Sequence, residues 1–316
     1  MTKAYFEILR SGINTTYQDV GRNSLYHIGI PFSGAMDKRN LLISNKLVGN
    51  KQTSPAIEFA LQGPLLRLNN SKANFVITGD VNFNIIRKNS IIEKGNCYQS
   101  YVLEDSDQLD IISTNRSVYG YLSVQGGYKI DSFWNSYSVN TKAKIGPNNG
   151  EKFSNSQKIF LNNIKESFHK KKINYLNSKI EFIRVIKGTN YDYFSEKAKK
   201  IFLSEEFKIS KLSDRMGMRL EGSKLENIMD TNIRSEGLIK GVIQVPADGN
   251  PIVMLSDHGT IGGYPKIAVV ISADYDKIAQ LPPGTKIKFK LIDLKEAENL
   301  YKLYRFETEN ILNQIQ

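Results

Sequence analysis

The chain has 316 residues, a formal net charge of +11 and a single cysteine, Cys97. One cysteine excludes an internal disulfide and a cysteine-based zinc site. Apolar residues make up 40% and charged residues 24% of the chain, which is typical of a globular protein rather than a disordered one. No apolar run approaches the ~20 residues of a membrane helix, and the start lacks the apolar core of a signal peptide. We therefore expect a cytoplasmic protein with no membrane partner.

Short strand patterns recur along the chain. Apolar residues alternate with other residues over 57–61, 75–77, 119–124 and 286–291, and each run lies next to a glycine or proline turn. Many short strands with Gly, Pro and Asn turns are typical of barrels and sandwiches rather than of a parallel α/β sheet. The sequence therefore predicts a mainly β fold.

A few short helices are expected among these strands. The first is predicted over 35–48. Another is predicted to begin near Asp293, because Asp293 and Glu296 have the spacing of a capping box. A short helical turn is predicted over 275–281.

The stretch 140–180 is the least regular, with many Asn, Lys and Ser residues. We place a boundary there, between an N-terminal β lobe, 1–178, and a C-terminal lobe, 179–316, that ends in a helix. Residues 165–200 hold ten Lys or Arg and four Asp or Glu, a net charge of +6. A solvated surface and a nucleic-acid patch both explain this run. No recognised nucleic-acid motif accompanies it, so we favour the surface and expect no nucleic-acid partner.

The most glycine-rich segment, residues 237–265, holds six glycines in 29 positions and ends in GGYP. A hairpin tip is predicted at 248–249, and its second strand leads to Asp257 and His258. Gly262 and Gly263 then allow a positive φ or a close approach to a ligand, and backbone N–H groups there can bind an anion. A tight turn with a surface histidine is the alternative. We favour a binding or catalytic loop because the glycines and a titratable pair coincide.

The sequence SDRMGMRLEG predicts a strand whose methionines face the core. Arg215 and Arg219 then lie on the other face, and Gly217 between them leaves room for a ligand. The two arginines are about 13 Å apart along a strand, so they cannot both bind one small carboxylate. Either they bind two ends of a larger ligand, or one pairs with a protein acid. For Arg219 we favour a pair with Asp214 or Glu221.

Ser33 and Gly34 precede the first predicted helix, and Asp37 lies in its first turn. A helix N-terminus has unpaired N–H groups and a partial positive charge, which suit a phosphate or a carboxylate. Plain capping of the helix explains the pattern equally well. The three histidines show no metal-ligand spacing, so we expect no metal site.

Eight segments in register resemble the family of 5-oxoprolinase C subunits, also described as the biotin-dependent carboxyltransferase or allophanate-hydrolase subunit 2 family. They are TTYQDVGR (15–22), PFSGAMD (31–37), LVGN (47–50), AIEF (56–59), LSVQGG (122–127), SDRMGMRL (213–220), GVIQVPADGNPIVMLSDHGTIGGYPKIA (241–268) and AQLPPGTKIKF (279–289).

The resemblance implies cyclophilin-like β-barrels in both lobes. It also implies that the chain works together with the B and A subunits of 5-oxoprolinase. Such a complex converts 5-oxo-L-proline to L-glutamate while hydrolysing ATP, and this is our leading hypothesis. The alternative is a biotin-dependent carboxyltransferase of the urea carboxylase type, with biotin on a partner chain because no biotin-attachment segment occurs here. A third possibility is a non-enzymatic antagonist of a kinase inhibitor, a role also described in the family.

The resemblance also supports the candidate site. We expect Arg215, Asp257 and His258 to be catalytic. The expected substrate-binding residues are Ser33, Gly34, Asp37, Asp214, Arg219, Gln244, Gly262, Gly263 and Tyr264. The sequence departs from the family at Tyr137, where an arginine is expected. We further expect the loops around 33, 215 and 262 to gather at one groove, and the chain to be nearly inactive without its partners.

Overall fold

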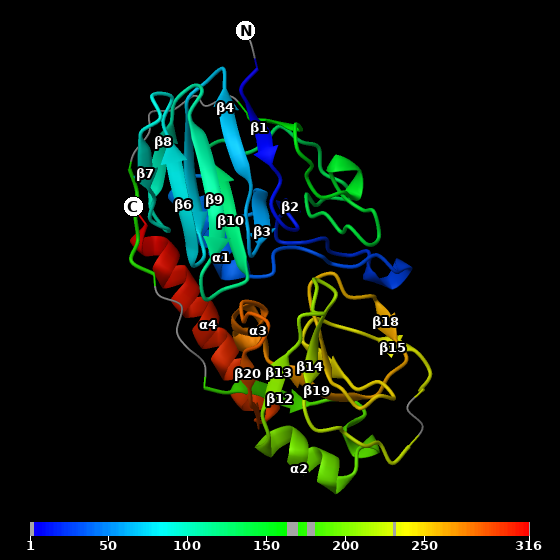
Figure 1. Cartoon of the computed structure of the whole chain (residues 1–316). Helices are drawn as coiled ribbons and strands as arrows, with labels where there is room; N and C mark the ends of the chain where they lie inside the picture. Colours follow the sequence, from blue (N-terminus) through cyan, green and yellow to red (C-terminus); the bar gives the residue numbers. More distant parts are fainter. Residues whose placement is uncertain (1–2, 163–169, 176–180, 230–231, 316) are drawn as a thin grey trace. The chain divides into compact units, whose positions relative to one another are not determined.

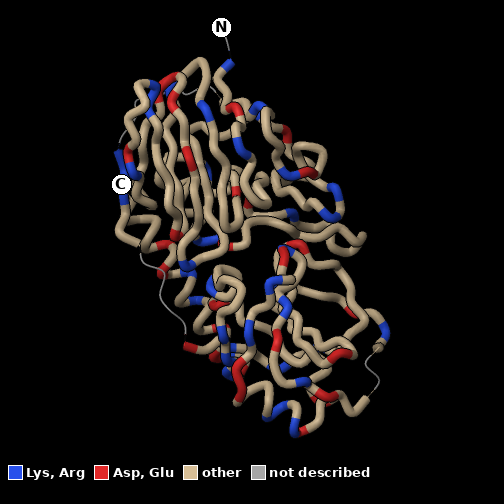
Figure 2. Tube along the Cα trace, in the orientation of Figure 1, with Lys and Arg blue, Asp and Glu red and all other residues tan. Residues whose placement is uncertain are grey.

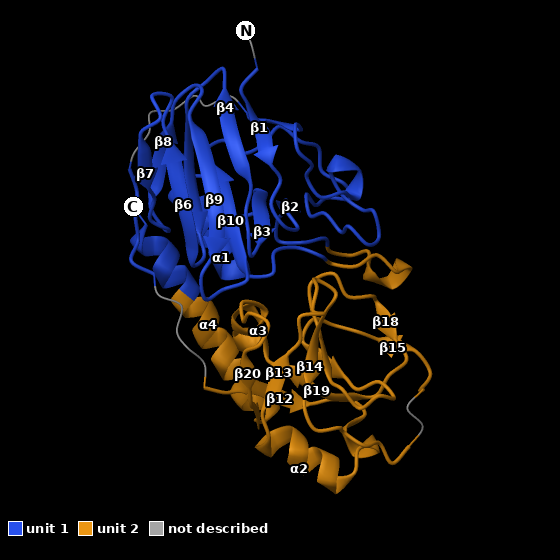
Figure 3. Ribbon diagram, viewed as in Figure 1, with its two compact units in different colours: residues 1–22, 33–176, 308–316 blue, residues 23–32, 177–307 orange. Residues whose placement is uncertain are grey.

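The structure is a computed structural model that describes residues 3–162, 170–175, 181–229 and 232–315. The chain divides into two compact units, shown in Figure 3. Unit 1 is Met1–Arg22, Ser33–Leu176 and Thr308–Gln316, and unit 2 is Asn23–Phe32 and Asn177–Glu307. The predicted boundary between 178 and 179 lies outside the described residues, so the division into lobes 1–178 and 179–316 stays a prediction.

Unit 1 contains two antiparallel sheets (Figure 1). The six-stranded sheet has the order β11 (Lys158–Phe160), β1 (Tyr5–Arg10), β4 (Leu65–Asn69), β9 (Gln108–Thr114), β6 (Val81–Ile86) and β7 (Ile92–Lys94). The five-stranded sheet has the order β2 (Thr16–Gln18), β3 (Ala56–Ala60), β10 (Tyr119–Val124), β5 (Ala73–Thr78) and β8 (Ser100–Leu103).

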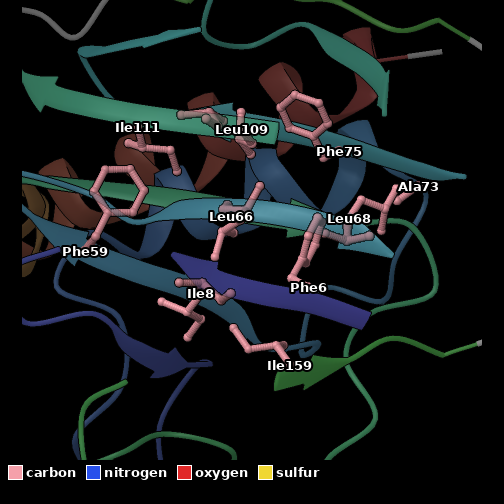
Figure 4. Close-up of a cluster of buried hydrophobic side chains, with 14 of the residues drawn as sticks. Phe6, Ile8, Phe59, Leu66, Leu68, Ala73, Phe75, Leu109, Ile111 and Ile159 are labelled. Atoms are coloured by element: carbon pink, nitrogen blue, oxygen red, sulfur yellow. The ribbon is translucent and has the colours of Figure 1, made fainter. Parts of the chain in front are cut away.

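Side chains of both sheets join in one hydrophobic core, shown in Figure 4. The six-stranded sheet contributes Phe6 and Leu66, and the five-stranded sheet contributes Phe59 and Phe75, all fully buried. Burial of so many large side chains is the main stabilisation of the unit, at roughly 1.5–3 kcal/mol for each.

Helix α1 (Lys38–Leu47) packs against the five-stranded sheet, where Ile43 and Leu47 contact Val76 of β5. The whole of β3, β5 and β10 is therefore buried on both faces. The alternating pattern correctly predicted these strands but not their complete burial. The predicted helix 35–48 is confirmed with a later start, because the side chain of Asp37 caps it by accepting the N–H of Asn40 at 2.9 Å.

Unit 2 is built on an eight-stranded sheet that is nearly closed into a barrel (Figure 1). Its order is β20 (Lys286–Ile287), β13 (Phe207–Ile209), β14 (Gly217–Glu221), β17 (Ile252–Met254), β16 (Val242–Gln244), β19 (Lys266–Val270), β12 (Ile183–Lys187) and β21 (Phe289–Leu291). All of its pairs are antiparallel except β12 with β21.

The two edges of this sheet are consecutive in the chain. Only Lys288 separates β20 from β21, so one extended run, predicted as a single strand over 286–291, pairs with β13 on one side and with β12 on the other. This arrangement leaves few unpaired backbone groups at the edges. The mainly β, barrel-like fold predicted for the chain is confirmed.

The remaining elements of unit 2 lie around the barrel. Helix α2 (Glu196–Ser204) is capped by Ser195 and stacks Phe202 on Phe289 of β21, with ring centroids 4.6 Å apart. Helix α3 (Ser272–Ala279) matches the helical turn predicted over 275–281. A separate two-stranded ribbon pairs β15 (Glu236–Gly237) with β18 (Ile261–Gly262).

Helix α4 (Leu294–Gln314) confirms the helix predicted from Asp293, whose carboxylate accepts the N–H of Glu296 at 2.7 Å. Its residues up to Glu307 belong to unit 2 and those from Thr308 belong to unit 1. No helix in the described part of the chain is long and apolar enough to cross a membrane.

Part of the basic run 165–200 falls outside the described residues, but α2 within it is described. There Lys199 pairs with Glu196 at 2.7 Å, and its ammonium group lies 5.1 Å from the centre of the Tyr191 ring. Figure 2 shows basic and acidic residues interspersed along both units. Mixed charge of this kind favours a solvated surface over a nucleic-acid patch.

Candidate functional site

Arg215 and Asp257 form a buried ion pair in unit 2. Nε of Arg215 lies 2.8 Å from Oδ2 of Asp257, and Nη2 lies 3.0 Å from Oδ1, with the two side chains 5% and 3% exposed. The two residues come together because Arg215 lies two residues before β14 and Asp257 lies three residues after β17. These two strands pair in antiparallel fashion, so the start of β14 lies beside the end of β17. The N–H of Asp257 also donates to the carbonyl of Arg215 at 2.8 Å. A two-bond pair of this kind fixes the plane of the guanidinium group.

This arrangement differs from the predicted strand. Arg215 lies before β14 rather than on its face, and it is Arg215, not Arg219, that pairs with a protein acid. Among the described residues, Arg219 forms no ion pair with Asp214 or Glu221, and its side chain is exposed. Asp214 instead accepts the N–H groups of Met216 and Gly217, at 2.8 and 3.2 Å, and so shapes the turn before β14. The predicted core position of Met216 is wrong, since 38% of this residue is exposed.

His258 is buried beside this ion pair, with only 1% of the residue exposed. Its Nδ1 lies 2.6 Å from the carbonyl oxygen of Gly259, whereas its Nε2 is buried with no hydrogen-bond partner among the described residues. The ring of Tyr26, from a short 3₁₀ helix (Tyr26–Ile28), meets the imidazole edge-on at 6.1 Å. The alternative of a tight turn with a surface histidine is therefore wrong.

The titration of His258 follows from this environment. Burial is the largest effect and lowers the pKa of His258 below its ordinary value. The positive charge of Lys240 lowers this pKa further, while the Gly259 carbonyl and the Asp257 carboxylate oppose the shift. Burial also raises the pKa of Tyr26 to about 12, so its hydroxyl stays protonated and donates to the carbonyl of Leu238.

The GGYP segment is held by close backbone packing. Neither Gly262 nor Gly263 has a positive φ, and the positive φ predicted for these glycines is therefore wrong. Instead, a Cβ added at Gly262 would lie 2.7 Å from Nε2 of Gln244, which itself donates to the carbonyl of Tyr264 at 3.1 Å. The close approach predicted for a ligand is thus made by the buried Gln244 side chain. Tyr264, at the end of this segment, is 40% exposed.

Ser33, Gly34 and Asp37 lie together in unit 1. Ser33 is fully buried with a φ of 54°, a strained conformation for a residue other than glycine, and its hydroxyl accepts from Nδ2 of Asn140 at 3.3 Å. Asp37 caps α1, which confirms the capping alternative for its carboxylate. The predicted helix start immediately after Ser33 and Gly34 is wrong, because α1 begins at Lys38 and Asp37 is its N-cap.

Gly34→Ala is expected to destabilise the chain more than the matched change Gly49→Ala. Both glycines have a positive φ, +88° and +72°, so each substitution incurs roughly 1–2 kcal/mol of backbone strain. At Gly34 the new Cβ would also lie 3.0 Å from backbone atoms of Gly21, whereas nothing lies within 4 Å at Gly49. We expect a further ~1–3 kcal/mol for Gly34→Ala, measured by urea unfolding. Equal losses for the two variants would contradict close packing of the 33–37 loop.

Two buried carboxylates of unit 1 were not among the predicted site residues. Asp19, in the TTYQDVGR motif, binds the segment that contains Tyr137 by accepting its N–H at 2.7 Å. Glu58, in the AIEF motif, accepts the N–H of Met36 at 2.8 Å and the hydroxyl of Tyr121 at 2.7 Å, so it holds the chain next to Asp37. The sequence contained a signal for both residues, because each acid interrupts an apolar or uncharged strand pattern. Strand alternation alone, however, does not distinguish a buried acid from a solvated one.

A family model described as "Carboxyltransferase domain, subdomain A and B" matches residues 28–291. The chain belongs to this carboxyltransferase-domain family. The 5-oxoprolinase C subunit of Haemophilus influenzae is 33% identical over 310 residues, which cover 98% of this chain and 97% of that protein. The 5-oxoprolinase C subunit of Escherichia coli is 32% identical over 295 residues, 92% of each chain. The resemblance inferred from the eight sequence segments is confirmed.

The crystal structure of the Kluyveromyces lactis urea carboxylase has the same fold, with a TM-score of 0.87 and 26% identity. The match covers 98% of this chain but 29% of the urea carboxylase chain. This member of the carboxyltransferase-domain family therefore corresponds to less than a third of that larger protein.

In this carboxyltransferase-domain chain the candidate residues are distributed over both units. Ser33, Gly34 and Asp37 belong to unit 1, and the other candidates belong to unit 2. The gathering of the loops around 33, 215 and 262 at one groove stays a prediction. Among the described residues, no three His, Cys, Asp or Glu side chains come together as a metal-binding group.

Proposed function

We propose that this chain is the C subunit of an ATP-dependent 5-oxoprolinase complex, which cleaves 5-oxo-L-proline to L-glutamate with ATP hydrolysis. The main support is the 33% identity to a protein of that name over nearly the full length of both chains. The buried group of Arg215, Asp257 and His258 supplies charged and proton-transferring side chains suited to such a reaction. We place the reaction in the cytoplasm, in a complex with the B and A subunits of 5-oxoprolinase.

The chemistry explains why such a group is needed. A lactam is a poor electrophile and water is a poor nucleophile at neutral pH, so phosphorylation of the lactam oxygen by ATP makes the ring carbon attackable. Negative charge then develops as water adds, and a preorganised cation stabilises it. We assign this role to Arg215, whose orientation is fixed by its two bonds to Asp257.

The other candidates are proposed to bind the substrate. Gln244 and the Gly262–Gly263 backbone would present amide groups, and Tyr264 an exposed ring, at the end of the segment that carries His258. Asp214 would act from the turn before β14, and Arg219 from β14 itself. Ser33, Gly34 and Asp37 would contribute from the strained loop of unit 1.

The second candidate function is carboxyl transfer from biotin on a partner chain. It is favoured by the family description and by the fold shared with the urea carboxylase. The two functions are separated by supplying the chain, together with the A and B subunits, either with 5-oxoproline and ATP or with carboxybiotin and urea. We expect ATP-dependent glutamate formation and no labelled carboxyl transfer. Carboxyl transfer without glutamate formation would favour the second function.

A further inference from the structure

The tautomer of His258 is fixed by its local contact. A carbonyl oxygen can only accept a hydrogen bond, and the Gly259 oxygen lies 2.6 Å from Nδ1. Nδ1 therefore carries the proton, which leaves a lone pair on Nε2. This nitrogen is deeply buried and has no hydrogen-bond partner among the described residues. An unpaired buried acceptor costs free energy of folding unless a ligand donates a hydrogen bond to it.

Asp257 is the other group that could move a proton, and its contacts argue against that role. Both of its carboxylate oxygens accept from Arg215, at 2.8 and 3.0 Å, inside the fold. Protonating this carboxylate would break a buried ion pair. The structure thus separates the two neighbours: Asp257 positions Arg215, and His258 has the available lone pair.

We infer that Nε2 of His258 is the proton acceptor for the attacking water, an inference that rests on the proposed 5-oxoprolinase function. As the water oxygen bonds to the activated ring carbon, Nε2 takes one water proton. The ring carbon–nitrogen bond then breaks, the added oxygen becomes the carbonyl oxygen of an acyl phosphate, and its remaining proton is released to solvent. In the same step the imidazolium returns its proton to the ring nitrogen, which leaves as the amine. The phosphoryl group delivered by ATP stays on the carboxyl oxygen and leaves as phosphate when a second water attacks. His258 ends the cycle neutral.

The surroundings of His258 favour the neutral form that this step requires. The charged groups that act on the ring are Lys240, which disfavours a second positive charge, and Asp257, whose charge is already paired with Arg215. The Nζ of Lys240 lies 5.6 Å from the centre of the Tyr275 ring, and the Tyr275 hydroxyl lies 3.2 Å from Oγ of Ser256, two residues before His258. Tyr26 faces the ring but stays protonated.

The first test needs no activity. The full chain, labelled with ¹⁵N in its three histidines, is titrated by NMR with His27 as an exposed reference. We expect His258 to carry its proton on Nδ1 at pH 7, with Nε2 unprotonated, and to take up a second proton only below its ordinary pKa of about 6.5. A proton on Nε2 at pH 7 would overturn the inference, whatever the complex does.

The second test uses the complete complex with 5-oxoproline and ATP. His258→Asn keeps an amide N–H for the Gly259 carbonyl but cannot accept a proton, so we expect kcat to fall at least ~100-fold and the acidic limb of the pH–rate profile to disappear. His27→Gln is the matched control and should leave both unchanged. Full activity of His258→Asn would refute the inference. An inactive wild-type complex would instead refute the proposed function, while the NMR result would still stand.

Discussion

Arg215→Ala is expected to lower glutamate formation by the complete complex about 10²–10³-fold and to destabilise the chain by about 3–5 kcal/mol. Activity falls because the cation proposed to stabilise the developing charge is gone. Stability falls because the carboxylate of Asp257, 3% exposed, loses its bidentate partner inside the fold. Urea unfolding of the chain and glutamate release by the complex measure the two effects separately.

Two further variants distinguish the effects. The double change Arg215→Met with Asp257→Leu removes both charges, so much of the lost stability should return while activity stays lost. Lys286→Ala breaks the exposed pair with Glu206, whose side chains are 69% and 46% exposed, and should cost no more than about 1 kcal/mol. If Arg215→Ala were no more destabilising than Lys286→Ala, the buried ion pair would not have the energetic role assigned to it.

Asp19→Ala is expected to be among the most destabilising single changes in unit 1, at more than about 3 kcal/mol. The buried carboxylate accepts from the N–H of Gly21 at 2.8 Å, from the hydroxyl of Ser136 and the N–H of Tyr137 at 2.7 Å, and from the hydroxyl of Ser138. Alanine would leave these donors without their acceptor, and each such loss costs roughly 1–3 kcal/mol when the donor is buried.

The matched control is Asp105→Ala, which removes an exposed carboxylate that accepts from the N–H of Asn70 at 2.6 Å. Water can replace that bond, so we expect a loss below about 1 kcal/mol. Chemical unfolding of both variants gives the comparison. Similar losses at the two positions would show that the network around Asp19 does not hold the 136–138 segment in place.

The sequence predicted most elements of the fold because their signals are local. Strand alternation located β3, β5 and β10, and the spacing of Asp293 and Glu296 located the start of α4. The closing of the barrel could not be predicted in this way. It depends on which strands pair with 286–291, and pairing between distant strands leaves no spacing pattern in the chain.

The candidate site shows the same limit at the level of single residues. The sequence singled out Arg215, Asp257 and His258, but it predicted the ion pair for Arg219, because Asp214 and Glu221 lie close to Arg219 in the chain. The observed ion pair joins Arg215 to Asp257, which is 42 residues away in the chain. The two residues are adjacent only because β14 pairs with β17. Likewise, nothing local showed that Nε2 of His258 would be buried while Nδ1 contacts a carbonyl.

The most direct measurement of the proposed function is glutamate released from 5-oxoproline per ADP formed, with each component of the complex omitted in turn. We predict coupled formation of glutamate and ADP by the complete set of this chain with the A and B subunits. Omission of this chain should abolish glutamate release, and adding the chain back should restore it. No glutamate from the complete set, or an undiminished rate without this chain, would contradict its assignment to a 5-oxoprolinase complex.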